Sequence, residues 1–270
     1  MTIYEIELEH GAFHGLSSWR AAGGGELVMK NESNEAFTRL PLWLFPIILF
    51  SLIGLDAAFA ELVRATHLDS AGGLLGWLLE PHRRVGAVGY LLSGFLVCGL
   101  IWAWASRNGI VDRIIPFKAP SLKDWGWALL GFLVSTMVAY ALLPIINSIG
   151  PVRGRDYNLH DPAMFALITV YAVLVGPALE EIVFRGFGIG YLIGRRVNQW
   201  FAGLIVLIIF VVTHIPAFGP AAMLLVLPVS ILITVFRIIS GNLTPGLILH
   251  MLNNTLAFLV LPLLSSRPPA

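Results

Sequence analysis

Polar side chains with chemical potential stand in three otherwise apolar stretches of the second half of the chain. The stretches read "VGPALEEIVFRGFGIGYL", "IIFVVTHIPAFGP" and "LTPGLILHMLNNTLAF". Ionisable groups are rare inside membranes, because their insertion is costly, so each one is a functional hypothesis by default. The candidate residues are Glu180, Glu181 and Arg185 in the first stretch, His214 in the second, and His250 and Asn254 in the third.

The first group divides into a pair and a single carboxylate. Glu181 and Arg185 are four residues apart, so on a helix they share a face in the favourable order, with the acid before the base. Glu180 points about 100° away around the helix, so it is less well placed to form an ion pair with Arg185. A carboxylate in an apolar site is a tunable group that suits general-base catalysis on water. The alternative is an ion pair that only holds two helices together, which leaves Glu180 unexplained.

The other two groups can complete a hydrolytic site. His250 and Asn254 are also four apart, so they can aim two donors at one oxygen, as an oxyanion hole requires. An interhelical polar clamp is the structural alternative. Glu180 and His214 together can hold and deprotonate a water molecule. The sequence offers no Ser–His–Asp set, no HExxH zinc helix and no paired aspartates of the GxGD type, and its single cysteine, Cys98, excludes an intrachain disulfide.

The elements that must position these residues are membrane helices. The 270-residue chain is 57% hydrophobic and 12% charged, about half the charged share of a soluble domain, and its net charge of +1 gives no sign of nucleic-acid binding. Apolar runs that approach or exceed the roughly 20 residues needed to cross a bilayer follow one another from residue 40. We therefore predict an all-α polytopic membrane bundle with seven or eight transmembrane helices, over residues 41–63, 85–105, 126–147, 163–192, 200–216, 221–240 and 245–264.

The fourth run carries two further signals. It is too long for one upright crossing, so it must tilt, break near Pro177 or extend beyond the membrane. Gly186, Gly190 and Gly194 recur every four residues, which predicts close approach of a second membrane helix rather than a dinucleotide site.

Beyond the three stretches with candidate residues, the sequence suggests little chemistry. Asp56 and Glu61 are expected near the end of the first helix, close to Arg64, as boundary markers. We predict that residues 1–39 form a polar N-terminal extension and that residues 40–270 form a single membrane domain. Ten of the 17 Lys and Arg residues fall on the N-terminal side and six on the other, with Arg185 set aside, which favours a cytoplasmic N-terminus of this multi-pass protein.

Three motifs in order produce a family resemblance. "EEIVFRG" fits EExxxR, "FVVTH" from Phe210 to His214 fits FxxxH, and "HMLNN" from His250 to Asn254 fits HxxxN. Over roughly residues 165–260 the chain resembles the CPBP family of intramembrane endopeptidases, which includes CAAX prenyl endopeptidases and bacteriocin-immunity (Abi) proteins. The first 160 residues carry no such motif.

The resemblance implies a role for each candidate residue. Glu180 would activate water with help from His214, while His250 and Asn254 would form the oxyanion hole. Glu181 and Arg185 would support the helix. The family has also been described as metal-dependent, and Glu180, His214 and His250 would be adequate ligands for Zn²⁺; we favour a mechanism that requires no cofactor, and leave the zinc alternative open.

The predicted function is therefore an intramembrane endopeptidase that hydrolyses a peptide or membrane-protein substrate at or within the bilayer. The alternative is a non-proteolytic scaffold or immunity-type protein of the same fold, and a proton-relaying transporter ranks third. One geometric problem remains. Measured along its helix, His214 lies about 21 Å from Trp200, whereas His250 lies only about 7–8 Å from Pro245. A shared site requires the four side chains of Glu180, His214, His250 and Asn254 to meet in one cavity.

Overall fold

The computed structural model describes residues 35–70, 72–79, 84–152 and 157–265. Within those ranges seven helices are long and apolar enough to cross a membrane: Leu44–Thr66, Val85–Arg107, Leu122–Ile149, Pro162–Gly194, Gln199–Phe218, Ala222–Ser240 and Thr244–Ser265. The described chain contains no strand. The predicted polytopic helical membrane bundle is thus confirmed.

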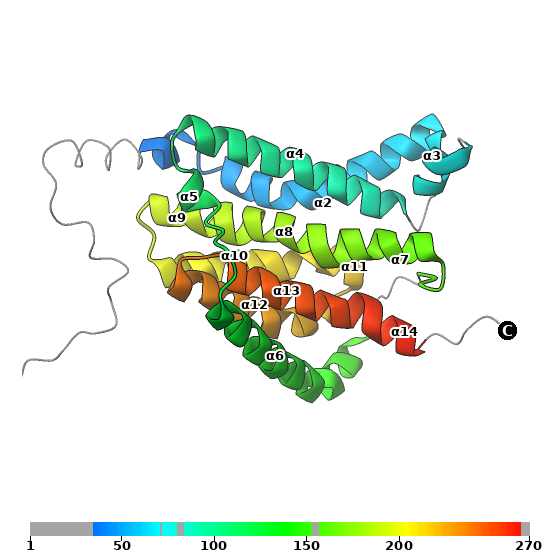
Figure 1. The fold of residues 1–270 in the computed structure, drawn as a ribbon. Coiled ribbons are helices and arrows are strands. Elements are labelled where there is room, and N and C mark those ends of the chain that lie inside the picture. The colour runs from blue at the N-terminus through cyan, green and yellow to red at the C-terminus, as the bar shows by residue number, and fades with distance from the viewer. Residues whose placement is uncertain (1–34, 71, 80–83, 153–156, 266–270) are drawn as a thin grey trace, which may run out of the picture.

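A central rod organises the bundle (Figure 1). The rod runs through α7 (Pro162–Ile168), α8 (Gly176–Glu180) and α9 (Ile189–Gly194), joined by two π-helical stretches, η2 (Thr169–Val175) and η3 (Glu181–Gly188). It lies between two groups of helices. On one side are α2 (Leu44–Thr66) and α4 (Val85–Arg107), which pack against each other. On the other are α10 (Gln199–Thr213), α12 (Ala222–Ser240) and α13 (Thr244–Thr255).

One further long helix and several short elements complete this arrangement. Helix α6 (Leu122–Ile149) packs against α12 and α13. The short elements are η1 (Leu68–Ser70), α3 (Gly73–Leu78), α5 (Val111–Ile114), α11 (Ile215–Phe218), the π-helical η4 (Leu256–Val260) and α14 (Leu261–Ser265).

The ends of the helices follow from local sequence signals. Helix α6 begins four residues before the predicted run, because Ser121 and Asp124 form a reciprocal capping box at its start. Helix α2 continues to Thr66, so Asp56 lies in its middle rather than at its boundary, and the predicted position of Asp56 is wrong. Glu61 pairs with Arg64 on the exposed surface of the same helix, as expected.

Most of the predicted N-terminal extension, residues 1–34, lies outside the described residues. Residues 35–39 form a helical turn that packs on the bundle, and Phe37 is fully buried there. Its ring lies edge-on to Trp104, with 5.8 Å between the ring centroids. The backbone carbonyls of Phe37 and Leu40 accept hydrogen bonds from Arg195. The membrane domain therefore begins its packing a few residues before position 40.

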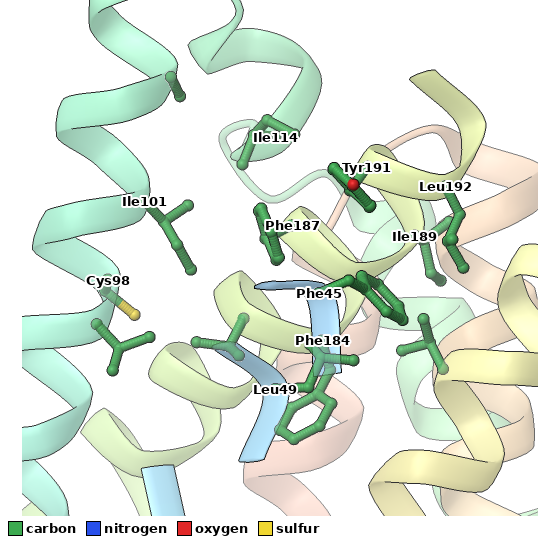
Figure 2. Packing of buried hydrophobic residues seen from close by; sticks show 14 of the residues in the cluster. Phe45, Leu49, Cys98, Ile101, Ile114, Phe184, Phe187, Ile189, Tyr191 and Leu192 are labelled. Carbon is green, nitrogen blue, oxygen red and sulfur yellow. The ribbon is translucent and has the colours of Figure 1, made fainter. Parts of the chain in front are cut away.

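Aromatic and aliphatic side chains fill the end of the bundle at which α5 and α9 meet (Figure 2). Phe184, Phe187 and Tyr191 project from the rod, and Phe187 stacks on Tyr191 with 5.5 Å between ring centroids. Leu49 of α2 and Ile114 of α5 close around them, and both are fully buried. This cluster fixes the part of the rod that follows Glu180 and Glu181 in the chain.

The glycines of the rod permit close packing, but against other partners than predicted. A Cβ atom on Gly186 would lie 2.3 Å from the Ile114 carbonyl oxygen, and one on Gly190 would lie 3.2 Å from the Arg113 carbonyl oxygen. Gly194 faces the ring of Phe37. The expected second membrane helix is therefore wrong for these three positions. It is Gly188 that faces a membrane helix, at Val206 of α10.

Gly186→Ala is expected to destabilise the protein by about 1–3 kcal/mol, because the new methyl group meets backbone that cannot rotate away. Gly99→Ala on α4 is the matched control, since a Cβ atom there has no neighbour within 4 Å. That control should keep or slightly raise stability, because alanine favours helix. Equilibrium unfolding in mixed detergent micelles measures both variants. Equal stability of the two would contradict the close contact at Gly186.

Candidate active site

The candidate residues meet around one cavity of about 440 Å³ in the interior of the bundle. Its walls come from α2, α4, the rod, and the helices α10 to α14. All four residues required for a shared site line it, together with two that the sequence did not single out for chemistry: Glu180, His214, His250, Asn254, Tyr90 and Asp56.

His214 and His250 can share a site although they lie at different distances from the starts of their helices, because α13 starts inside the protein. Asn242, Leu243 and Thr244 at its start are 5%, 1% and 6% exposed. The Thr244 hydroxyl donates to the carbonyl of Lys118, and the Leu243 amide donates to the carbonyl of Pro116. The preceding loop is thus covered by protein, and a count from Pro245 does not start at the membrane surface.

Glu180 occupies the last position of the α8 turn, between the two π-helical stretches. Its Oε1 accepts a hydrogen bond from the phenol of Tyr90 on α4. Its Oε2 lies 3.6 Å from Nε2 of His250. The side chain is 17% exposed, so it borders the cavity without being sealed from it.

Glu181 and Arg185 form the expected pair, and both side chains are fully buried. The Arg185 Nη1 lies 3.4 Å from Glu181 Oε1, and the guanidinium lies over the ring of Phe210, 3.9 Å from its centroid. The same Glu181 oxygen lies 2.9 Å from Nδ1 of His250. Glu181 therefore has a second contact that its spacing from Arg185 did not predict, and it connects the ion pair to the cavity.

The hydrogen bond of His214 defines its tautomer. Its Nδ1 lies 2.8 Å from the carbonyl oxygen of Phe210, one turn earlier on α10. A carbonyl oxygen only accepts, so Nδ1 carries a proton. In the neutral ring, Nε2 is then an acceptor. This contact also explains the FxxxH spacing, because residues four apart on a helix place the carbonyl beneath the imidazole, while the Phe210 ring covers Arg185.

Asn254 is oriented by a backbone carbonyl that the proline in the rod leaves open. Gly176 donates its N–H to Tyr171, five residues back, in the π-helical register. In that register Pro177 would follow as the donor to Ala172, but proline has no N–H. The Ala172 carbonyl instead accepts from Nδ2 of Asn254 at 2.8 Å. One N–H of the amide is thereby committed, and the second remains to donate.

Pro177 therefore does not break the fourth span. The rod continues from Pro162 to Gly194, and the change of register on either side of α8 accommodates the proline. Single π-helical turns inside α-helices occur frequently at functional sites. Here two such stretches flank the turn that ends with Glu180.

The zinc alternative requires Glu180, His214 and His250 to converge on one ion. Among the described residues, no three His, Cys, Asp or Glu side chains are arranged to hold one metal ion. Glu180, His214 and His250 do not converge on one point as ligands of a metal would, and the proposed mechanism uses no metal. Their chemistry as ligands still makes chelation an informative experiment.

Sequence reasoning overlooked Tyr90 and undervalued Asp56. Tyr90 lies in the apolar run of α4, where a tyrosine is unremarkable, and its partner is 90 positions away. Asp56 faces Gly89 of α4, where a Cβ atom would lie 2.7 Å from Oδ1 of the aspartate. The available signal was its own chemistry, since a carboxylate in the middle of a membrane span faces protein or a cavity.

A family comparison covers the part of the chain that contains all three motifs. The model of the family "Type II CAAX prenyl endopeptidase Rce1-like" matches residues 162–256. No curated protein and no solved structure matched the chain. The family match confirms the resemblance inferred from the motifs: residues 162–256 are similar to the Rce1-like type II CAAX prenyl endopeptidases.

Proposed function

We propose that this chain is an intramembrane endopeptidase in which Glu180 activates the attacking water. The similarity of residues 162–256 to type II CAAX prenyl endopeptidases supports a CAAX-type membrane protease. The observation that carries the proposal is the opening of Glu180, His214, His250 and Asn254 into one cavity inside a membrane bundle. The proposed substrate is a peptide or the tail of a membrane protein, whose scissile carbonyl would enter this cavity.

In the proposed reaction, water attacks the peptide carbonyl while Glu180 Oε2 takes one of its protons. His214 assists through Nε2, which accepts a hydrogen bond from the same water. The carboxylic acid form of Glu180 then delivers its proton to the leaving amine, which restores the carboxylate. This exchange balances one proton taken from water against one given to the amine.

The oxyanion is proposed to accept hydrogen bonds from Asn254 and His250. Asn254 supplies the N–H that Ala172 does not use. His250 would donate from Nε2, which faces the Glu180 side of the cavity, while its Nδ1 lies 2.9 Å from Oε1 of Glu181. The buried Glu181–Arg185 pair thereby supports the oxyanion hole as well as the helix.

The test is cleavage by the purified chain in lipid vesicles, followed by mass spectrometry of the products. Substrates should include a peptide ending in a prenylated CAAX sequence, the same peptide without the prenyl group, and an unrelated membrane peptide. We expect new fragments with the wild type, and their formation at least about 100-fold slower with a Glu180→Gln preparation. If both preparations leave every peptide intact, the proposal fails and the non-proteolytic scaffold or immunity-type alternative is favoured.

Metal dependence is tested on the same preparation. We expect cleavage to persist after prolonged chelation, with no stoichiometric metal found by elemental analysis. Loss of cleavage on chelation and its return with Zn²⁺ would instead support Glu180, His214 and His250 as ligands of a catalytic metal.

A further inference from the structure

Tyr90 contacts the proposed general base from outside the region that matches the family. It lies on α4, more than 70 residues before residue 162, in the apolar segment "VGAVGYLLSG". Its phenol donates a hydrogen bond to Oε1 of Glu180. The ring lies edge-on to Tyr171 with 5.5 Å between centroids, and it borders the cavity beside Glu180.

The face of α4 that carries Tyr90 is seated on the turn that carries Glu180. Tyr90, Gly94 and Cys98 are spaced four apart and therefore share this face. A Cβ atom on Gly94 would lie 2.5 Å from Leu179 Cδ1, so the glycine gives that side chain its space. The Cys98 thiol lies 3.7 Å from the Leu179 carbonyl oxygen. These two contacts to Leu179 hold α4 in the position from which the phenol of Tyr90 reaches Glu180.

The hydrogen bond makes the two oxygens of Glu180 different. An ionised carboxylate only accepts, and a hydrogen bond to a charged group is among the stronger ones. Tyr90 occupies Oε1, while Oε2 lies 3.6 Å from His250 Nε2. Rotation of the carboxylate would break the first contact and move the second oxygen away from the histidine.

We propose that Tyr90 is a positioning residue for catalysis: it holds Oε1 of Glu180 so that Oε2 is the oxygen that takes the proton from water. The inference rests on the proposed function, because it assigns a step to Glu180. It adds a residue from the first half of the chain to a site whose other proposed members all lie in the matched segment.

The kinetic test is Tyr90→Phe, which keeps the ring and its packing on Tyr171 and removes only the hydroxyl. We expect kcat to fall about 10- to 100-fold, the range set by one hydrogen bond to a charged group, with KM and stability unchanged. Tyr140→Phe is the matched control, because this tyrosine is 75% exposed on α6. An unchanged kcat for Tyr90→Phe, or a fall explained by a loss of stability, overturns the proposal.

A second measurement is independent of activity. Incorporation of 3-fluorotyrosine at position 90 or at position 140 gives one fluorine resonance in each labelled protein. We expect Glu180→Gln to shift the resonance at position 90 and to leave the one at position 140 in place, and an unshifted resonance at position 90 overturns the contact. Cleavage at the wild-type rate by Tyr90→Phe, together with its loss in Glu180→Gln, removes the role of Tyr90 alone. A wild type that cleaves no peptide removes the proposed function instead.

Discussion

Glu180→Gln is expected to lower kcat about 10²- to 10⁴-fold, the range contributed by a positioned general base. Glutamine has nearly the same shape, and its carbonyl oxygen can still accept the hydrogen bond from Tyr90. What the amide cannot do is take a proton from water at the position of Oε2. Fold and substrate binding should therefore be kept while the chemical step is lost.

The measurement is the cleavage rate of the reconstituted protein at saturating substrate, with substrate binding measured separately. Glu61→Gln is the matched control, because that carboxylate lies on the exposed face of α2 and pairs only with Arg64 among the described contacts. Cleavage by Glu180→Gln at the wild-type rate would contradict the role of Glu180. Loss of cleavage in both variants would show that activity is lost non-specifically during preparation, and not because the site has changed.

Arg185→Ala is expected to cost about 3–5 kcal/mol of stability, as removal of one partner from a buried ion pair does. Both Arg185 and Glu181 are fully buried, so truncation of the arginine leaves a carboxylate without its counter-charge. The guanidinium also covers the ring of Phe210, and that packing is lost with it. Such a loss is a large fraction of the roughly 5–15 kcal/mol that stabilises a typical protein.

Equilibrium unfolding in mixed micelles again provides the measurement. Arg107→Ala at the exposed end of α4 is the control and should change stability by no more than about 0.5 kcal/mol. The double variant Glu181→Gln with Arg185→Met removes both charges and keeps an acceptor for His250, so it should be more stable than Arg185→Ala alone. A double variant as unstable as Arg185→Ala would mean that packing around the arginine, rather than the unpaired charge, causes the loss.

The sequence predicted the parts of the site that depend on local spacing. The Glu181–Arg185 pair follows from a separation of four residues on a helix, and the membrane spans follow from apolar length. The contacts of Tyr90 with Glu180 and of His250 with Glu181 join residues 90 and 69 positions apart. No periodicity within one helix encodes such contacts, because they depend on how the helices are placed against one another.

Two local features also escaped prediction, each for a physical reason. Each hydrogen bond of a π-helical stretch spans one residue more than in an α-helix, and no change in the apolar pattern of residues 169–188 reveals it. The start of α13 was placed at the membrane surface because Thr244 and Pro245 resemble an ordinary helix start. Their burial depends on the loop around Pro116 and Lys118, which folds back over them.

The packed aromatic end of the bundle has a consequence for the membrane itself. A cavity that admits water into a bilayer is a potential leak for ions and protons. Phe184 lines the cavity and also belongs to the cluster with Phe187 and Tyr191, whose side chains are at most 3% exposed. At the end of the bundle where α5 and α9 meet, the cavity therefore borders closely packed aromatic and aliphatic side chains. The tight packing of these rings therefore hinders the passage of water and ions from the cavity through this end of the bundle.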